Sequence, residues 1–180
     1  MAAFTVIDHT ELGATTASWS ATSIAASYDH LLLKASIRGT RVSTNEELVI
    51  TLNSDTTAAN YSSTRLRALS ATPSSTRSST GDYAGWDKPQ IPAASATANT
   101  FGILEIWIPN YANTANFKQA LMQTCQENAS TSNNAWYLEL GAGLYHSTSA
   151  IDAVSVTTKN SGLGGLAQYS TFTLYGVTGA

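Results

Sequence analysis

Residues 28–61 read YDHLLLKASIRGTRVSTNEELVITLNSDTTAANY, and this stretch decides the fold. Its first part alternates apolar and polar side chains, a period of two that is typical of a strand with one face on a core. Its second part repeats that pattern, and residues 39–46 between the two are polar and long enough for a hairpin loop. The apolar positions of the two strands are Leu31, Leu33, Ala35 and Ile37, then Leu48, Ile50 and Leu52.

Composition supports the same fold class along the whole chain. Only 12% of the residues are charged, against about 25% in ordinary soluble domains. A helical protein would normally solvate its outer faces with charged side chains, whereas this chain uses hydroxyls and amides, which favours β-structure. We therefore expect an all-β protein, a jelly-roll-like antiparallel β-sandwich of about eight to ten strands.

The 180 residues are enough for one domain with a real core. We expect a single β-sandwich over residues 14–180, preceded by an N-terminal arm at residues 1–13, which could instead fold back as one more strand. Residues 100–108 are the strongest single strand, with Phe101, Ile103 and Trp107 on one face and Leu104, Ile106 and Ile108 on the other. Two apolar faces predict a central strand covered on both sides, or a strand at a subunit contact.

Two segments leave alternatives open. Residues 117–126 fit both the 3.6-residue period of a helix and the two-residue period of a strand. The strand-like segments around them favour a strand. Residues 70–92 are rich in Ser, Thr, Pro and Gly and predict a long loop, which in a compact domain is usually functional. Tyr83 and Trp86 within it either cap the end of the sandwich or form an exposed surface that could stack on a sugar.

Charge, targeting signals and cysteine count limit the partners and the covalent cross-links that we expect for this chain. A net charge of −3 leaves no basic footprint, so we expect no nucleic-acid partner. The first residues, MAAFTVIDHTELG, lack the basic and apolar regions of a secretory signal, and no segment approaches the about 20 apolar residues of a membrane helix. The single cysteine, Cys125, excludes an intramolecular disulfide.

Motifs that carry chemistry are weak. The three histidines have no pairing motif, and Asn53, Asp55 and Asn60 suit turn closure better than a Ca²⁺ loop. No G-x-S-x-G elbow occurs. Glycoside hydrolysis needs two converging carboxylates, and the acidic strand residues that could converge are Glu105, Glu139 and Asp152. We expect Glu105 to pair with an arginine or face solvent, and we expect no enzyme, no cofactor and no metal.

Four motifs carry a resemblance. They are the run ATTASWSATSIAASYDHLLLKASIRGTR, the loop ELVITLNSDTTAANY, WIPNY, and the closing TFTLYGV. In this succession the chain resembles small virion proteins of tailed bacteriophages. The resemblance spans roughly residues 14–177, and its motifs are structural, so it transfers no catalytic residues.

The resemblance implies a jelly-roll protein on the outer surface of a phage particle, made in the host cytoplasm. The expected role is head decoration, a cement protein that forms a homo-oligomer, first of all a trimer, and contacts the major capsid protein or other virion proteins. The alternative is a tail, baseplate or fibre component that binds a host glycan. The candidate interface residues are Phe4, Val6, Ile7, Leu12, Tyr83 and Trp86.

Overall fold

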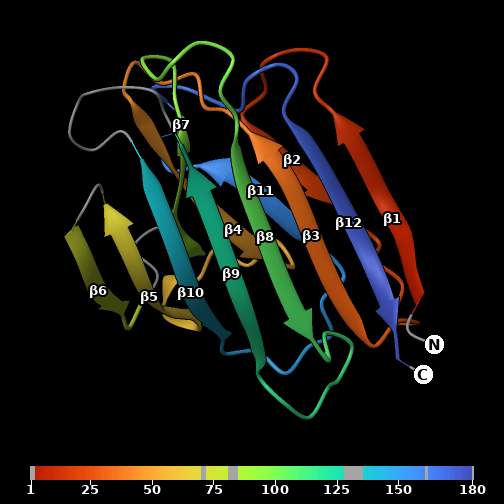
Figure 1. Cartoon of the computed structure of the whole chain (residues 1–180). Helices are drawn as coiled ribbons and strands as arrows, with labels where there is room; N and C mark the ends of the chain where they lie inside the picture. The colour runs from red at the N-terminus through yellow and green to blue at the C-terminus, as the bar shows by residue number, and fades with distance from the viewer. Residues whose placement is uncertain (1–2, 70–71, 81–84, 128–135, 161, 180) are drawn as a thin grey trace.

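The computed structural model describes residues 3–69, 72–80, 85–127, 136–160 and 162–179, and these form twelve β-strands and one short 3-10 helix. An eight-stranded sheet, the large sheet, packs against a four-stranded sheet, the small sheet, and every strand pair is antiparallel. Figure 1 looks onto the large sheet with the small sheet behind it. The expected all-β, jelly-roll-like sandwich is confirmed, with more strands than the sequence pattern predicts.

The order of the strands across each sheet differs strongly from their order along the chain. The large sheet runs β1-β12-β3-β8-β9-β10-β5-β6 and the small sheet β2-β11-β4-β7. The large-sheet strands are β1 (Ala3–Glu11), β12 (Thr171–Thr178), β3 (His30–Ile37), β8 (Gly102–Pro109), β9 (Lys118–Gln126), β10 (Tyr137–Tyr145), β5 (Tyr61–Leu69) and β6 (Thr72–Ser78). The small-sheet strands are β2 (Ser18–Ala21), β11 (Val154–Thr158), β4 (Asn45–Leu52) and β7 (Trp86–Pro92), and the 3-10 helix η1 is Ala58–Asn60.

The two strands of residues 28–61 do not form the expected hairpin. β3 pairs with β12 and β8 in the large sheet, whereas β4 pairs with β11 and β7 in the small sheet. Each strand has one apolar face, and placing the two strands in opposite sheets lets those faces meet across the core. The connection therefore crosses the sandwich.

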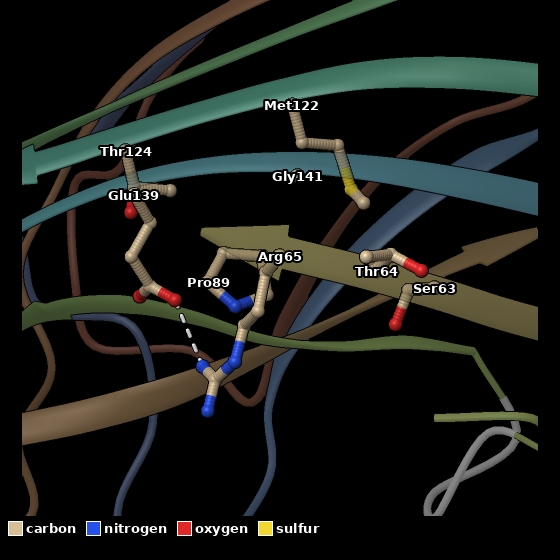
Figure 2. A pocket seen from close by; sticks show the side chains of 8 residues that line it. All are labelled: Ser63, Thr64, Arg65, Pro89, Met122, Thr124, Glu139 and Gly141. Atoms are coloured by element: carbon tan, nitrogen blue, oxygen red, sulfur yellow. Dashed lines mark hydrogen bonds and ion pairs between the residues drawn. The ribbon is translucent and has the colours of Figure 1, made fainter. Parts of the chain in front are cut away.

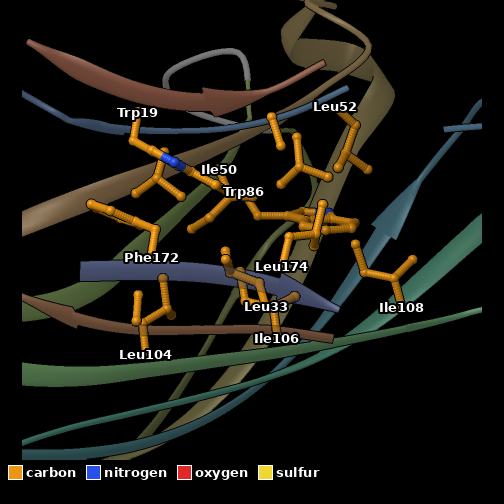
Figure 3. Packing of buried hydrophobic residues seen from close by; sticks show 14 of the residues in the cluster. Trp19, Leu33, Ile50, Leu52, Trp86, Leu104, Ile106, Ile108, Phe172 and Leu174 are labelled. Atoms are coloured by element: carbon orange, nitrogen blue, oxygen red, sulfur yellow. The ribbon is translucent and has the colours of Figure 1, made fainter. Parts of the chain in front are cut away.

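The core fills the space between the sheets (Figure 3). Leu33, Ile106 and Leu174 of the large sheet face Ile50 and Leu52 of the small sheet, and all are essentially inaccessible to solvent. At one end Trp19 stacks on Phe172 with ring centroids 4.8 Å apart and planes 7° apart. The alternation in β3 and β4 thus predicted the core faces correctly.

Three segments differ from or resolve the sequence expectations. Residues 70–92 contain β6 and β7, so most of that segment is strand and not the predicted loop. The Ser and Thr residues that indicated a loop are also compatible with an edge strand such as β6. Residues 118–126 form a strand, with Lys118, Ala120 and Met122 on its buried face. The predicted arm is instead largely β1, paired with β12 of the same chain, which is the alternative left open above.

Candidate functional site

The outer face of the large sheet, turned away from the small sheet, carries most of the exposed large apolar side chains. Leu138 and Leu66 retain 65% and 57% of their accessible surface. Ile103, Leu121 and Leu140 are also exposed. We call these five residues the outer apolar patch.

Strand register explains why the outer apolar patch is continuous. Cys125 of β9 stands opposite Ile103 on one side and Leu138 on the other. In the next row Leu140 stands opposite Leu66. Side chains opposite one another on a sheet lie about 5 Å apart, so the patch spans four neighbouring strands from β8 to β5. Above Leu66, Leu138 and Leu140 lies a shallow hollow of about 210 Å³.

β8 therefore has only one covered face. Leu104, Ile106 and Ile108 are buried in the core, whereas Ile103 is exposed on the outer face. Of the two explanations for its doubly apolar pattern, coverage on both sides is not provided by the described part of the chain. A subunit contact stays a prediction.

One ion pair interrupts the apolar surface of the outer face. Lys34 Nζ lies 2.9 Å from Glu105 Oε2, and both side chains remain partly exposed. The hydrogen bond from Lys34 to Glu105 and the Coulomb attraction raise the pKa of Lys34. Glu105 thus faces solvent, the second of the two expected outcomes, and its ion-pair partner is a lysine and not an arginine.

The candidate interface residues divide between the outer face and the core. Phe4 and Val6 are exposed on β1, and the Phe4 ring lies edge-on to Tyr175 with centroids 6.2 Å apart. Val6 stands opposite Tyr175, so both extend the outer face to the sheet edge. Ile7 is partly buried against the core.

Trp86 and Leu12 are core residues and not interface residues. Trp86 is fully buried, and its indole N–H donates to the Leu144 carbonyl over 3.1 Å. Leu12 is buried in the same core cluster. Trp86 is therefore unavailable to stack on a sugar, and Tyr83 lies outside the described residues.

A small internal pocket lies between β5, β9, β10 and β7 (Figure 2). There Arg65 Nη1 donates to Glu139 Oε1 over 2.8 Å, and only 5% of the Glu139 side chain is exposed. Burial raises the pKa of Glu139, although the Arg65 charge acts in the opposite direction. Within the described part of the chain, Glu139 Oε2 and Thr124 Oγ1 have no hydrogen-bond partner.

The size of this pocket decides what it can hold. Its volume is about 20 Å³, room for about one water molecule, whereas a substrate site commonly needs 300 Å³ or more. The pocket suits a bridging water between Glu139 and Thr124 and not a substrate.

The three acidic residues considered for glycoside hydrolysis do not share a cleft. Glu105 shares an outer-face row with Gln123 and Leu140, so Glu139, one residue earlier in β10, points to the opposite face. Asp152 lies outside the strands, in the connection between β10 and β11. The arrangement offers no facing pair of carboxylates among these three.

The Asn53–Asp55–Asn60 loop closes a turn. Asp55 accepts hydrogen bonds from Thr57 N, Asn60 Nδ2 and Tyr145 Oη over 2.8, 2.7 and 3.0 Å. Asn53 Oδ1 accepts from Asp152 N over 2.9 Å. These contacts confirm the turn interpretation. Among the described residues no group of three or more His, Cys, Asp or Glu side chains could hold a metal ion, and no helix there is long and apolar enough to span a bilayer.

The sequence pattern does not predict the exposure of four leucines, Leu66, Leu121, Leu138 and Leu140. A usable signal was present in YLELG, where Leu138 and Leu140 share one face and Tyr137 and Glu139 the other. Judged by hydrophobicity alone, the face with the two leucines would be placed in the core, and the face with the tyrosine and the glutamate would be placed outside. The structure places Tyr137 and Glu139 inside, because both have polar partners there.

Comparison with known proteins identifies no family. No family model and no curated protein sequence matches the chain. Among solved structures, alginate lyase Aly36B is similar over 95% of this chain and 79% of its own, with 10% sequence identity and a TM-score of 0.27. A likeness this weak carries no conclusion about activity.

Proposed function

We propose that this chain is a structural protein of the outer surface of a tailed-bacteriophage particle, a head decoration protein that self-associates and works by burying surface. The observation that carries the proposal is the outer apolar patch on a face that no other part of the described chain covers. Patches of this kind on soluble proteins usually mark sites of protein association.

The occupant that fits the outer face best is a second copy of the chain. Eight strands about 4.8 Å apart and about 25 Å long present up to roughly 850 Å². A standard interface buries about 800 Å² per partner. The face is thus large enough for a stable contact.

Charge on the outer face is also compatible with self-pairing. Lys34 and Glu105 are adjacent and opposite in sign, so this pair adds no net charge to the face. A two-fold packing can set Lys34 of one copy against Glu105 of the other, because in an isologous interface each contact occurs twice. This symmetry favours an even number of chains, and the trimer expected from the sequence remains the competing assembly.

The phage setting rests on the resemblance, and the contacts of its motifs support a structural role for them. Tyr28 packs on Gly176, where an added Cβ would lie 2.4 Å from the ring. Arg38 donates to backbone carbonyls of the β7–β8 connection. Asp55 and Tyr61 close the loop after β4. These three motifs therefore stabilise the sandwich.

The particle itself tests the proposed location. Gold-labelled antibody against the chain, applied to purified phage particles and viewed by electron microscopy, should decorate the heads. Label confined to the tail tip or baseplate would contradict head decoration and favour the tail alternative. Absence of the chain from purified particles would overturn the virion role.

Cys125 offers a test of the patch in solution, because it lies between Ile103 and Leu138 and is partly exposed. Its reaction rate with a water-soluble disulfide reagent should be slow in concentrated protein and should rise on dilution as the copies separate. A rate independent of protein concentration over the range in which the mass changes would show that another surface associates.

A further inference from the structure

A second hollow lies at one end of the sandwich, next to the Leu121 side of the outer apolar patch. It is formed by the end of β8, the β8–β9 connection and the start of β9, and has a volume of about 350 Å³. Its lining is Pro109, Asn110, Asn116, Phe117 and Gln119. We call it the β8–β9 hollow.

Phe117 provides an apolar platform on this hollow. Its side chain is 54% exposed. From the other side it is supported by His146, whose ring is stacked on it with centroids 5.6 Å apart and planes 24° apart. An exposed aromatic ring held in place by a neighbour is suited to pack against a flat, partly apolar ligand.

The backbone around the platform is tied down by hydrogen bonds. Lys118 is buried, and its Nζ donates to the carbonyls of Asn116 and Thr148 over 2.8 and 3.1 Å. Asn113 Oδ1 accepts from Ala115 N over 2.7 Å, and Asn110 N donates to His30 Nδ1 over 3.2 Å. Little conformational entropy would therefore be lost when a ligand binds.

The polar groups of the hollow are all neutral amides. Asn110, Asn116 and Gln119 are exposed, and no described residue forms a hydrogen bond with their side chains. Each amide offers a carbonyl acceptor and an NH₂ donor, the combination that can pair with adjacent hydroxyl groups. The only charged side chain at this turn, Lys118, points inward to backbone carbonyls.

Gln119 also lines an adjacent hollow of about 180 Å³ on the outer face. Its other polar side chains include Ser62, Thr64 and Arg77. Both hollows include Gln119 in their lining. The surface available to a ligand therefore extends beyond the Phe117 ring and continues along the hydroxyl groups of Ser62 and Thr64.

We infer that the β8–β9 hollow binds a neutral oligosaccharide. One sugar ring packs its C–H face on Phe117 while its hydroxyls pair with Asn110, Asn116 and Gln119, and the next residue extends past Gln119. The β8–β9 hollow itself contributes no cation, which favours a neutral sugar on Phe117, whereas the adjacent hollow past Gln119 includes Arg77. Phe117 lies beyond the outer apolar patch, while Gln119 stands two positions before Leu121 on the same face of β9 and joins the two surfaces. The inference does not require self-association.

A glycan array tests the inference directly. The probes are immobilised neutral oligosaccharides of hexoses and N-acetylhexosamines, with sialylated and sulfated glycans beside them. The intact chain should bind at least one neutral probe, and the free form of that oligosaccharide should then give a binding isotherm by calorimetry. Failure to bind any neutral probe, or binding to anionic probes alone, would overturn the inference.

Substitutions then assign the binding to this site. Phe117→Ala should weaken the affinity for the free oligosaccharide by at least about tenfold, and Gln119→Ala by a smaller factor, whereas Phe117→Tyr should preserve binding. Leu138→Asp, in the outer apolar patch, is the matched control and should leave the affinity for the free sugar unchanged. Equal affinity of Phe117→Ala and the unmodified chain would contradict the assignment, whether or not the chain self-associates.

Discussion

At the residue scale, Gly143 shows how closely the two sheets approach. An added Cβ at this position would lie 2.7 Å from the indole ring of Trp86, whereas at Gly141, on the same face of β10, the nearest atom would be 3.5 Å away. Trp86 is fully buried and cannot move outward. The missing side chain of Gly143 therefore makes room for the largest core residue.

Gly143→Ala should lower the free energy of unfolding by about 1–3 kcal/mol, the usual cost of overpacking. Gly141→Ala makes the same chemical change on the same strand and should be nearly neutral. Urea denaturation of both variants measures the difference. Equal losses in the two variants would mean that strand propensity, and not the contact with Trp86, determines the effect.

The burial of Glu139 should make the free energy of unfolding depend on pH. Its pKa is raised above 4.5 by burial, so the folded state binds the proton more tightly than the unfolded state. The corresponding stability is fully present below pH 4.5 and is lost as the pH rises through the raised folded-state pKa. The charged and titratable groups around it are Arg65, Arg67, Glu47 and Tyr137.

Glu139→Gln removes this titration and retains the side-chain shape. As the pH rises from 4.5 toward neutrality, the unmodified chain should lose stability relative to the variant. Glu46, whose pKa is raised mainly by burial, is present in both proteins and its contribution cancels. A stability difference that stays constant with pH, or that changes in the opposite direction, would contradict the raised pKa.

At the scale of the elements, periodicity predicted the core faces but not the pairing. The alternation in β3 and β4 fixes which side chains are buried, because a face is a local property of a strand. Sheet membership depends on contacts with strands distant in the sequence, such as β12 with β3 and β11 with β4. This is why the sequence predicts a hairpin loop where the chain in fact crosses from one sheet to the other.

Core substitutions in these two strands test the predicted faces. Leu33→Ala and Ile50→Ala should each lower the free energy of unfolding by about 2–5 kcal/mol, since both side chains are buried. Thr51→Ala, on the opposite face of β4, is the control and should have a small effect. If both core variants unfold at the same denaturant concentration as the unmodified chain, the assignment of the faces is wrong.

Arg38 anchors the connection between β7 and β8. Its guanidinium donates to the carbonyls of Thr97, Thr100 and Ala96 over 2.9, 2.8 and 3.1 Å. A guanidinium has five N–H donors in a fixed plane, and an ammonium cannot reproduce that geometry.

Arg38→Lys should therefore increase hydrogen exchange at the amides of residues 94–100 while the amides of β3 and β8 stay protected. Arg38→Ala should have a larger effect of the same kind and lower the free energy of unfolding by about 1–3 kcal/mol, since several carbonyls lose their donor. Unchanged exchange in residues 94–100 would show that the connection holds its conformation without Arg38.

At the scale of the whole molecule, composition and periodicity predicted the fold class, and neither predicted the exposed face. Low charge and abundant hydroxyls are properties of the whole chain. A fold class predicted from them is therefore correct even when the pairing of the strands is predicted wrongly. Exposure of Leu138 and Leu140 depends on which face of β10 the small sheet covers, which no local pattern encodes. The sequence also leaves open whether Trp86 is packed inside or exposed, since its burial depends on Gly143 of a distant strand.

The central claim is that the outer apolar patch closes on a second copy. Sedimentation equilibrium measures it most directly, with Leu138→Asp as the test variant and Val42→Asp, at an exposed apolar position away from the patch, as the control. The unmodified chain and Val42→Asp should sediment as twice 18.9 kDa, while Leu138→Asp should remain folded by circular dichroism and sediment as a single chain. A monomeric unmodified chain at every concentration, a three-chain mass, or an assembly unaffected by Leu138→Asp would contradict it.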